Sequence, residues 1–290
     1  MARTWKLAVA LLAAVLGQAA YAQSNSDWMT PIAPFQIAQG LYYVGSKDLA
    51  SYLIVTPQGD ILINSSFPDS PTLIRKSVEQ LGFKYTDIKI LLISHSHSDH
   101  DGGSARIIKE TGAKYMVMDG DVPVVESGGR LDFAYPDGSY PVAKVDRVLH
   151  DGDEVRLGST VLVAHKTPGH TRGCTTWTMK ANQGGKPLNV VIVGSWNVNP
   201  GFRLVDQPGG KPASYPGIAA DYRKTFAELK KLPCDIFLGA HGAYFNMLEK
   251  LSKAAPGAAG ESVWIDPKGY QAAVAEREHA FETELHKQGG

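Results

Sequence analysis

A short stretch of the chain concentrates side chains that bind metal ions. His95, His97, Asp99 and His100 form the pattern H-x-H-x-D-H, directly after an apolar run at 88–93 that has the composition of a buried strand. Each buried imidazole or carboxylate needs a partner, and one metal ion can partner several of them at once. A polar, solvated loop is the alternative, but ligands this closely spaced after a strand favour a metal site.

Two more histidines lie in similar settings. His170 occurs in Thr-Pro-Gly-His-Thr after a strand-like run that ends near 165, and His241 occurs in Gly-Ala-His-Gly after the run 235–238. Glycines at such strand ends let the backbone approach a ligand closely. Taken singly, either residue could be an exposed turn histidine. Together with the central cluster they bring the candidate ligands to six, enough for two metal ions with three protein ligands each.

Two groups of strands, each followed by helices, must hold these ligands. The predicted strands are 40–44, 51–56, 60–64, 88–93 and 114–118, then 154–157, 160–165, 174–179, 188–194 and 235–238. Helical spacing covers 71–81, with Ser70 as N-cap, and also 103–111, 219–231 and 267–287. This order predicts two packed sheets with helices on their outer faces. A glycine-rich passage at 126–141 has no periodicity, which is typical of a functional or disordered loop.

The composition argues against binding to nucleic acid or to anionic membranes, and it favours a single domain. Lys and Arg number 29, as do Asp and Glu, and no basic block occurs. The chain therefore has no electrostatic basis for binding nucleic acid or anionic membranes. No Ser/Gly/Pro-rich linker divides residues 23–290, so we expect a single domain there. The two cysteines, Cys174 and Cys234, cannot form a disulfide framework, and both lie beside apolar runs, which favours free thiols.

Residues 1–22 have the pattern of a secretory signal peptide. They begin with positive charge, continue with an apolar core at 7–16 and end with small residues around Ala22. The apolar core is too short to cross a bilayer of ~30 Å, which needs about 20 apolar residues. We therefore expect an exported, periplasmic protein that begins near Gln23 and has no membrane anchor after cleavage.

The motifs together resemble those of the metallo-β-lactamase superfamily. The resemblance rests on H-x-H-x-D-H after a strand, on Pro-Gly-His at His170 and on the late Gly-x-His at His241. It implies an α+β fold, a four-layer αββα sandwich with a di-metal active site at one edge of the two sheets. The superfamily also includes glyoxalase II, lactonases, ribonucleases and sulfatases, so these motifs do not name a substrate.

The residue at position 195 narrows the resemblance. Ser195 directly follows the run 188–194. At the corresponding position, di-metal hydrolases such as glyoxalase II carry a metal-bridging aspartate, and the first β-lactamase subclass carries a zinc-binding cysteine. A serine there, with His100 retained, resembles the third subclass of class B β-lactamases. Longer runs that agree with this subclass are 27–35, 169–175, 221–223 and 232–235.

The resemblance implies a zinc site and a reaction. The first of two zinc ions would be held by His95, His97 and His170, and the second by Asp99, His100 and His241. Neutral imidazoles and a carboxylate with an open coordination position are typical of catalytic zinc, and two ions ~3.5–4 Å apart can share a water and lower its pKa towards about 7. The implied reaction is hydrolysis of the β-lactam amide bond by a zinc-bridging hydroxide that Asp99 orients. Such an enzyme would confer antibiotic resistance.

The resemblance also implies substrate contacts. Ser195 would bind the substrate carboxylate, and Asn197 would assist where relatives often have a second serine. Phe133, Tyr135 and Trp28 would form an apolar wall at the mouth. Loop capping and ordinary packing are the alternatives for these five residues. The expected partner is a small-molecule β-lactam, and we expect a monomer.

Three positions depart from the subclass without removing a metal ligand. Asn64 stands where relatives usually have an aspartate that supports the ligands from outside, and losing such a carboxylate can cost 10–100-fold in metal affinity or activity. Phe202 stands where some members have a tyrosine whose hydroxyl aids the oxyanion, and Arg172 replaces a frequent proline. For the chain as a whole, the alternatives are another hydrolase of the same fold, such as a lactonase or thioester hydrolase, and an inactive zinc-binding relative, which only Asn64 supports.

Overall fold

Two β-sheets face each other in the computed structural model, which describes residues 27–254 and 261–290. The predicted signal peptide, 1–22, lies outside these described residues. Within them, no helix is both long enough and apolar enough to cross a membrane.

The first sheet has its strands in sequence order. They are β1 (Phe35–Ala38), β2 (Leu41–Tyr43), β3 (Tyr52–Thr56), β4 (Gly59–Ile63), β5 (Ile88–Leu92), β6 (Lys114–Met118) and β7 (Arg147–Leu149). Strands β1 to β4 pair antiparallel, and β4 to β7 pair parallel. The parallel half brings the carboxyl ends of its strands to one edge, where loops can meet.

The second sheet is mostly antiparallel and has the order β12-β11-β10-β9-β8. Its strands are β8 (Glu154–Leu157), β9 (Thr160–Lys166), β10 (Thr175–Gln183), β11 (Lys186–Val193) and β12 (Ile236–Gly239). Only the β11–β12 pair among these described strands is parallel. Strands β9, β11 and β12 therefore all end at the same edge.

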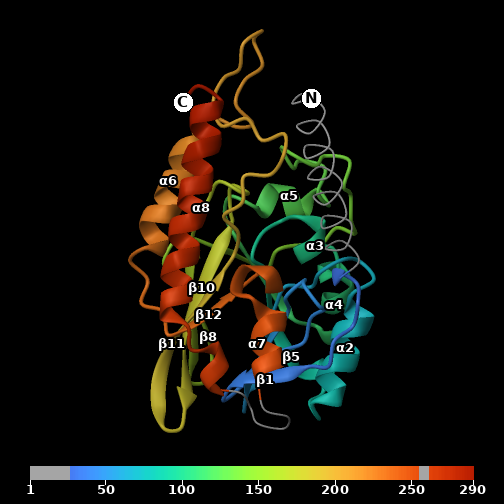
Figure 1. Ribbon diagram of the computed structural model, residues 1–290. Helices are drawn as coiled ribbons and strands as arrows, with labels where there is room; N and C mark the ends of the chain where they lie inside the picture. The colour runs from blue at the N-terminus through green and yellow to red at the C-terminus, as the bar shows by residue number, and fades with distance from the viewer. Residues whose placement is uncertain (1–26, 255–260) are drawn as a thin grey trace, which may run out of the picture.

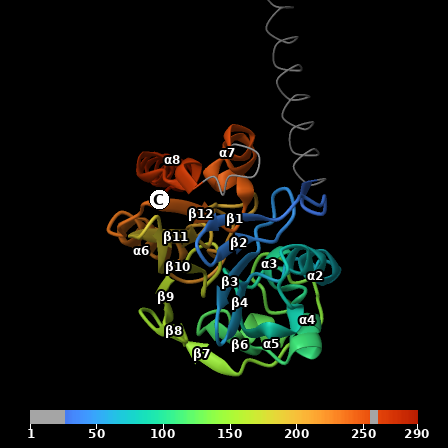
Figure 2. The same ribbon diagram turned by 90° about the horizontal axis from the view of Figure 1, so that it is seen from below.

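Helices cover the outer face of each sheet. The described helices are α2 (Pro71–Gln80), α3 (Ser98–Asp101), α4 (Ser104–Thr111), α5 (Val122–Glu126), α6 (Ile218–Leu229), α7 (Met247–Lys253) and α8 (Pro267–Lys287), with short 3-10 turns η1 (Tyr85–Asp87), η2 (Gly242–Phe245) and η3 (Glu261–Trp264). Viewed along the layers, α2, α4 and α5 lie outside the first sheet, and α6 and α8 lie outside the second (Figures 1 and 2). The predicted αββα sandwich is confirmed.

Side chains along the strands of the first sheet point alternately to its two faces, and this explains why a core lies on each side of the sheet. In β5, Ile90 and Leu92 face the core between the sheets, whereas Leu91 faces the core under the helices. Ile74 of α2 and Ile107 of α4 are fully buried in that second core. Successive side chains of a strand point to opposite faces, so a nearly continuous apolar run supplies both cores at once.

Details of the elements differ from the sequence predictions. Strands β1 and β7 were not predicted, because they are short and weakly patterned. Ser70 precedes α2 as expected, but its hydroxyl makes no capping hydrogen bond and instead lies 3.6 Å from the Met29 sulfur. Both Cys174 and Cys234 are free thiols, as favoured by the sequence.

Candidate metal centre

All six predicted ligands come together at the shared edge of the two sheets. His95 and His97 lie on the loop after β5, and α3 carries Asp99 and His100. His170 lies in the β9–β10 connection, and His241 follows β12. This edge collects the ligands because β5, β9 and β12 end there.

Two overlapping groups of ligand atoms define the centre. The side chains of His95, His97 and His170 offer atoms within 4.8 Å of one another, as do those of His95, Asp99 and His100. His241 joins the second group, since its Nε2 atom lies 3.2 Å from His100 Nε2 and 3.7 Å from an Asp99 oxygen. His95 therefore belongs to both groups, and the assignment of the six residues to two separate triplets stays a prediction.

Burial sets the protonation of these ligands. Burial lowers the pKa of His95, and neighbouring imidazoles lower it further. Burial likewise lowers the pKa of His170 to about 3 and lowers the pKa of His100 despite the adjacent Asp99. Burial would raise the pKa of Asp99, but His100 and His241 hold it well below its usual range. The lowered pKa values favour neutral imidazoles at His95, His100 and His170, and neutral imidazoles beside an ionised carboxylate are a donor set that zinc takes.

Hydrogen-bond partners outside the centre orient the imidazole rings. His170 Nδ1 lies 2.8 Å from the Asn197 carbonyl oxygen, and His241 Nδ1 lies 3.0 Å from an Asp48 carboxylate oxygen. Both partners are acceptors, so each Nδ1 carries its hydrogen and each Nε2 presents a lone pair to the centre. The residues present therefore fit a metal ion.

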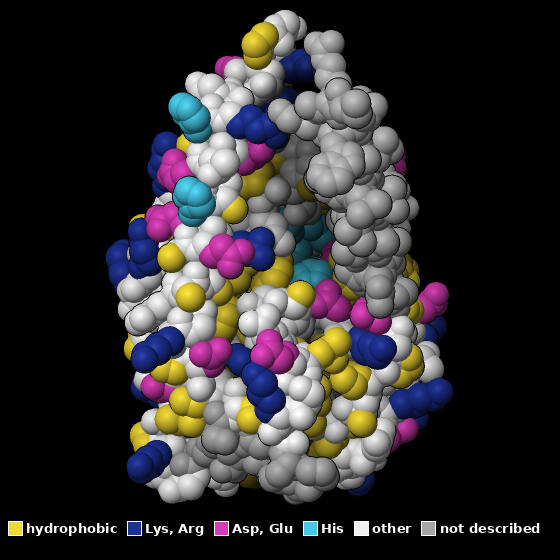
Figure 3. Space-filling view, in the orientation of Figure 1, with side chains coloured by type: hydrophobic (Ala, Val, Ile, Leu, Met, Phe, Trp, Pro, Cys, Tyr) yellow, Lys and Arg dark blue, Asp and Glu magenta, His cyan; other side chains and the backbone are white. Residues whose placement is uncertain are grey.

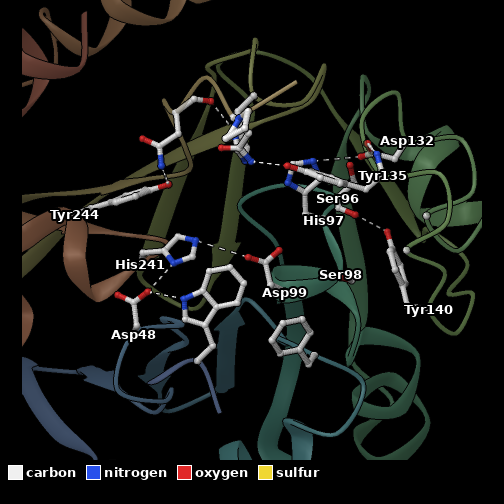
Figure 4. Close-up of a pocket in the computed structure, with 18 of the residues that line it drawn as sticks. Asp48, Ser96, His97, Ser98, Asp99, Asp132, Tyr135, Tyr140, His241 and Tyr244 are labelled. Atoms are coloured by element: carbon white, nitrogen blue, oxygen red, sulfur yellow. Dashed lines mark hydrogen bonds and ion pairs between the residues drawn. The ribbon is translucent and has the colours of Figure 1, made fainter. Parts of the chain in front are cut away.

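His97 is oriented in the opposite way to His170 and His241, with its Nε2 rather than its Nδ1 facing the outer partner. Its Nε2 lies 3.3 Å from Asp132 Oδ2, which leaves Nδ1 for a metal. Asp132 is itself fixed, because its other oxygen accepts hydrogen bonds from the backbone N–H groups of Ala134 and Tyr135. Burial alone would lower the pKa of His97, but the carboxylates of Asp132, Asp99 and Asp121 together outweigh burial and raise it. In Figure 4 this pair and the Asp48–His241 pair lie on opposite sides of Asp99.

Asp48 and Asp132 were both missed by sequence reasoning. Asp48 lies between β2 and β3 and also accepts hydrogen bonds from Trp28 Nε1 at 3.0 Å and from the Ala243 backbone at 2.8 Å. Its partner His241 is far away in the sequence, so no local motif could indicate the contact. Asp132 lies in the passage at 126–141, where likewise no local motif indicates its contact with His97.

The buried carboxylate of Asp121 ties the ligand loops to each other. Asp121 accepts hydrogen bonds from the Ser96 backbone at 3.0 Å, the Thr171 hydroxyl at 2.8 Å and the Gly173 backbone at 2.8 Å. Position 173 has to be glycine, since a Cβ there would lie 2.4 Å from the Asp121 backbone nitrogen. Asp121 thereby couples the loop of His95 and His97 to the loop of His170.

Comparison with known proteins gives the family. Residues 49–241, which contain all six ligands, match the model of the metallo-beta-lactamase superfamily. The chain belongs to this superfamily. It is a metallo-hydrolase, as the sequence predicted.

The solved structures that it resembles are metallo-beta-lactamases. FEZ-1 from Legionella gormanii is 50% identical, covers 90% of this chain and 98% of its own, and superposes with a TM-score of 0.83. BJP-1 from Bradyrhizobium japonicum, of subclass B3, is 37% identical over 91% of this chain and 97% of its own, with a TM-score of 0.81. The class B3 di-zinc enzyme LRA-12 from an Alaskan soil metagenome is also 37% identical over 90% and 97%, with a TM-score of 0.80. The predicted resemblance to the third subclass is thus confirmed.

Curated relatives include other hydrolases. A hydroxyacylglutathione hydrolase from Polaromonas sp. is 34% identical over 42% of this chain, which spans only 38% of that protein's length. A metal-dependent hydrolase from Anaeromyxobacter dehalogenans is 28% identical over 72% of this chain and 67% of its own. These partial matches support a metal-dependent hydrolase in general.

A cavity of about 540 Å³ opens onto the centre of this superfamily member. Histidine side chains are visible inside a hollow of the surface (Figure 3). Its lining includes Trp28, Tyr135 and Asn197, three of the predicted substrate contacts. It also includes residues that were not predicted: Phe67, Tyr140, Asn199, Tyr244 and Arg277.

Two predicted substrate contacts, Ser195 and Phe133, do not line the cavity. Ser195 is only 1% exposed, and its hydroxyl lies 3.0 Å from the Tyr244 hydroxyl. Phe133 packs edge-on against Phe202 and Tyr215 in the core between the sheets. The structure therefore places Ser195 behind Tyr244, and it places Phe133 in the alternative role of ordinary packing.

The three unusual positions also have definite surroundings. Asn64 is fully buried beside His100, and Phe202 is 4% exposed and has its ring 5.9 Å from that of His170. The guanidinium of Arg172 lies over the Tyr215 ring, 4.9 Å from its centroid. Phe202 supplies no hydroxyl to the site, and Arg172 makes a cation–π contact away from the ligands.

Proposed function

We propose that this protein is a zinc-dependent β-lactamase that is exported to the periplasm and confers resistance to β-lactam antibiotics. The observation that carries the proposal is the donor set. Asp99 is the one carboxylate in the described ligand groups, and Ser195 occupies the position after β11 where thioester hydrolases of this fold have a bridging aspartate. The subclass B3 structures that match nearly the whole described chain support the same conclusion.

Two zinc ions are part of the proposal. The first would be held by His95, His97 and His170, and the second by Asp99, His100 and His241. Bound zinc would lower the pKa of a water molecule towards about 7 and polarise a carbonyl oxygen. The lowered pKa values of His95 and His170 keep the lone pairs of these two imidazoles available without competition from protons near neutral pH.

Asp99 is the residue that we assign to catalysis. Its carboxylate is ionised, lies 3.2 Å from His100 Nε2 and has 15% of its side chain exposed. An ionised carboxylate at the cavity surface can accept a hydrogen bond from the attacking water and keep it aligned with the amide carbonyl. Because the water is the nucleophile, the reaction requires no serine or cysteine nucleophile.

The cavity can hold a small bicyclic amide that carries a carboxylate. Trp28, Phe67 and Tyr135 give the lining apolar area, whereas Asn197 and Arg277 give it hydrogen-bond donors and a positive charge. An apolar wall with a few placed donors is typical of small-molecule sites. We expect one chain to suffice, because the six ligands and this lining belong to the same chain.

Hydrolysis of a substrate panel tests the proposal. The purified protein, with zinc measured by atomic absorption, is given a penicillin, a cephalosporin, a carbapenem, a lactone and S-lactoylglutathione. We expect chelator-sensitive hydrolysis of at least one β-lactam and much slower turnover of the other two classes. Zinc-loaded protein that cleaves the lactone or the thioester but no β-lactam would refute the assignment, and inert zinc-loaded protein would favour a binding role.

The thioester is included because of the relatives named hydroxyacylglutathione hydrolase. Their match covers less than half of this chain, so we rank that activity second. Export is tested separately: fractionation should recover the protein in the periplasm with a mature N-terminus near Gln23. A cytoplasmic protein that retains residues 1–22 would contradict the export proposal alone.

A further inference from the structure

Tyr244 brings a phenol to the cavity from a position that the family motifs do not include. It lies in η2, three residues after the ligand His241, and their ring centroids are 5.1 Å apart. Room for the ring depends on Gly239, since a Cβ there would lie 2.9 Å from Tyr244 Cδ2. The chain therefore places this ring against the metal centre, as Figure 4 shows.

The Tyr244 hydroxyl is held by two neighbours. Asn197 Nδ2 donates to it at 3.1 Å, and Ser195 Oγ lies 3.0 Å away and can donate or accept. When Ser195 donates, both acceptor positions of the phenol oxygen are filled and its own hydrogen is available to a third group. An anion in the cavity would select this arrangement, with Ser195 donating to Tyr244 and Tyr244 donating to the anion.

Two other tyrosine hydroxyls close to the cavity donate to backbone carbonyls instead. Tyr140 donates to the Ser96 carbonyl at 2.6 Å, and Tyr222 donates to the Asn197 carbonyl at 2.6 Å. Phe202 has no hydroxyl. Burial raises the pKa of Tyr244, so its hydroxyl remains a neutral donor at physiological pH. Arg277 lines the same cavity, as do the carboxylates of Asp48, Asp99 and Asp132, and it lies 3.6 Å from Glu276, so the charge of the lining alone does not select an anion.

We propose that the Tyr244 hydroxyl binds the carboxylate of the substrate directly, and that Ser195 and Asn197 are positioning residues that act through it. This inference rests on the proposed β-lactamase function. It also explains how Ser195 can serve carboxylate recognition although it is almost fully buried: the tyrosine extends the reach of the serine into the cavity.

Tyr244→Phe tests the inference, because it removes the hydroxyl and keeps the ring. The assay compares benzylpenicillin with its methyl ester, which lacks the anion. A hydrogen bond to a charged group corresponds to a factor of about 10 to 100, so we expect KM for the acid to rise about that much, with a smaller change in kcat. The ester should be turned over equally well by both proteins. Tyr42→Phe, which removes a hydroxyl on β2, is the matched control.

Ser195→Ala separates the direct from the indirect role and remains informative if Tyr244→Phe folds poorly. We expect a smaller rise in KM for the acid, and a double variant no worse than Tyr244→Phe alone. A double variant with the full product of both effects would show that Ser195 binds the carboxylate itself, and would overturn the inference. Zinc content is measured for every variant, and all should bind as much as wild type.

The failures of the two proposals look different. Equal losses for acid and ester in Tyr244→Phe, with wild type active on both, would overturn the role of Tyr244 and leave the β-lactamase intact. Wild-type protein that hydrolyses neither compound when loaded with zinc would overturn the proposed function and this inference with it.

Discussion

Asn64 is a donor placed where a metal-bound histidine needs an acceptor. Its Oδ1 accepts from the Ser94 backbone at 2.7 Å, and its Nδ2 donates to the Ala50 carbonyl at 3.1 Å. These two bonds fix the amide orientation and point Nδ2 at His100 Nδ1, 3.4 Å away. If His100 gives the Nε2 lone pair to a metal, its Nδ1 carries a hydrogen, and two donors then face each other. We therefore expect Asn64 to weaken the second metal position.

Asn64→Asp reverses this conflict. A carboxylate can still accept from Ser94 and can also accept from His100 Nδ1. A carboxylate that accepts a hydrogen bond from a ligating histidine typically raises metal affinity about 10–100-fold, which equals about 1.4–2.7 kcal/mol of binding free energy. The same substitution should destabilise the metal-free protein. The Ala50 carbonyl would lose its hydrogen-bond donor, and the new, fully buried carboxylate would have no cationic partner. An unsatisfied buried group costs about 1–3 kcal/mol.

The two effects have opposite signs and can be measured separately. Competition with a chromophoric chelator gives the zinc affinities, and we expect the more weakly bound ion to tighten about 10–100-fold in Asn64→Asp. Urea unfolding should show that the metal-free variant is about 1–3 kcal/mol less stable than wild type, with much of the loss recovered when zinc is added. Asn182→Asp, which adds the same charge at an exposed position, is the control. A folded Asn64→Asp protein with wild-type zinc affinity would refute the donor conflict.

Three further predictions follow from the centre. Asp48→Ala removes the acceptor for His241 Nδ1, and we expect about 10–100-fold weaker binding of one zinc equivalent, measured by chelator competition; unchanged binding would show that Asp48 merely packs there. Asp99→Ala should cut β-lactam turnover severely, and near-wild-type kcat in a variant with full zinc content would contradict its catalytic role. Stability of the metal-free protein should fall as pH falls below about 6.5, because burial lowers the pKa of His170 from 6.5 to about 3 and the unfolded chain binds a proton that the folded chain does not. His170→Gln should flatten that slope in urea titrations, and an equally steep slope would assign it to other groups.

The ligands could be predicted from the sequence because their signals are local. His95 through His100 follow an apolar run, and His170 and His241 each follow a strand beside glycine, so the strand ends and the family motifs were enough. The residues that support them could not be predicted in this way. Asp48 contacts His241 across 193 positions, and neither residue's neighbours in the sequence indicate the pairing.

The direction in which a side chain points also could not be predicted from the sequence. Ser195 and Phe133 lie in segments that border the site, and the prediction assumed that bordering residues point inward. Ser195 is instead covered by Tyr244, and Phe133 packs with Phe202 and Tyr215 between the sheets. Such directions depend on which neighbour fills the adjacent space, and those neighbours come from distant parts of the chain.

The acceptors around the centre are unequally distributed between the two triplets. In the first, His97 faces the Asp132 carboxylate, His170 faces a carbonyl oxygen, and His95 Nδ1 lies 3.1 Å from the Ser94 hydroxyl, which can accept. In the second, His241 has Asp48, but His100 faces an amide donor. Since acceptors of this kind raise the basicity of a ligating imidazole, the first triplet should bind its ion more tightly. The protein is therefore expected to load metal in two distinct steps, with Asn64 as the residue that separates them.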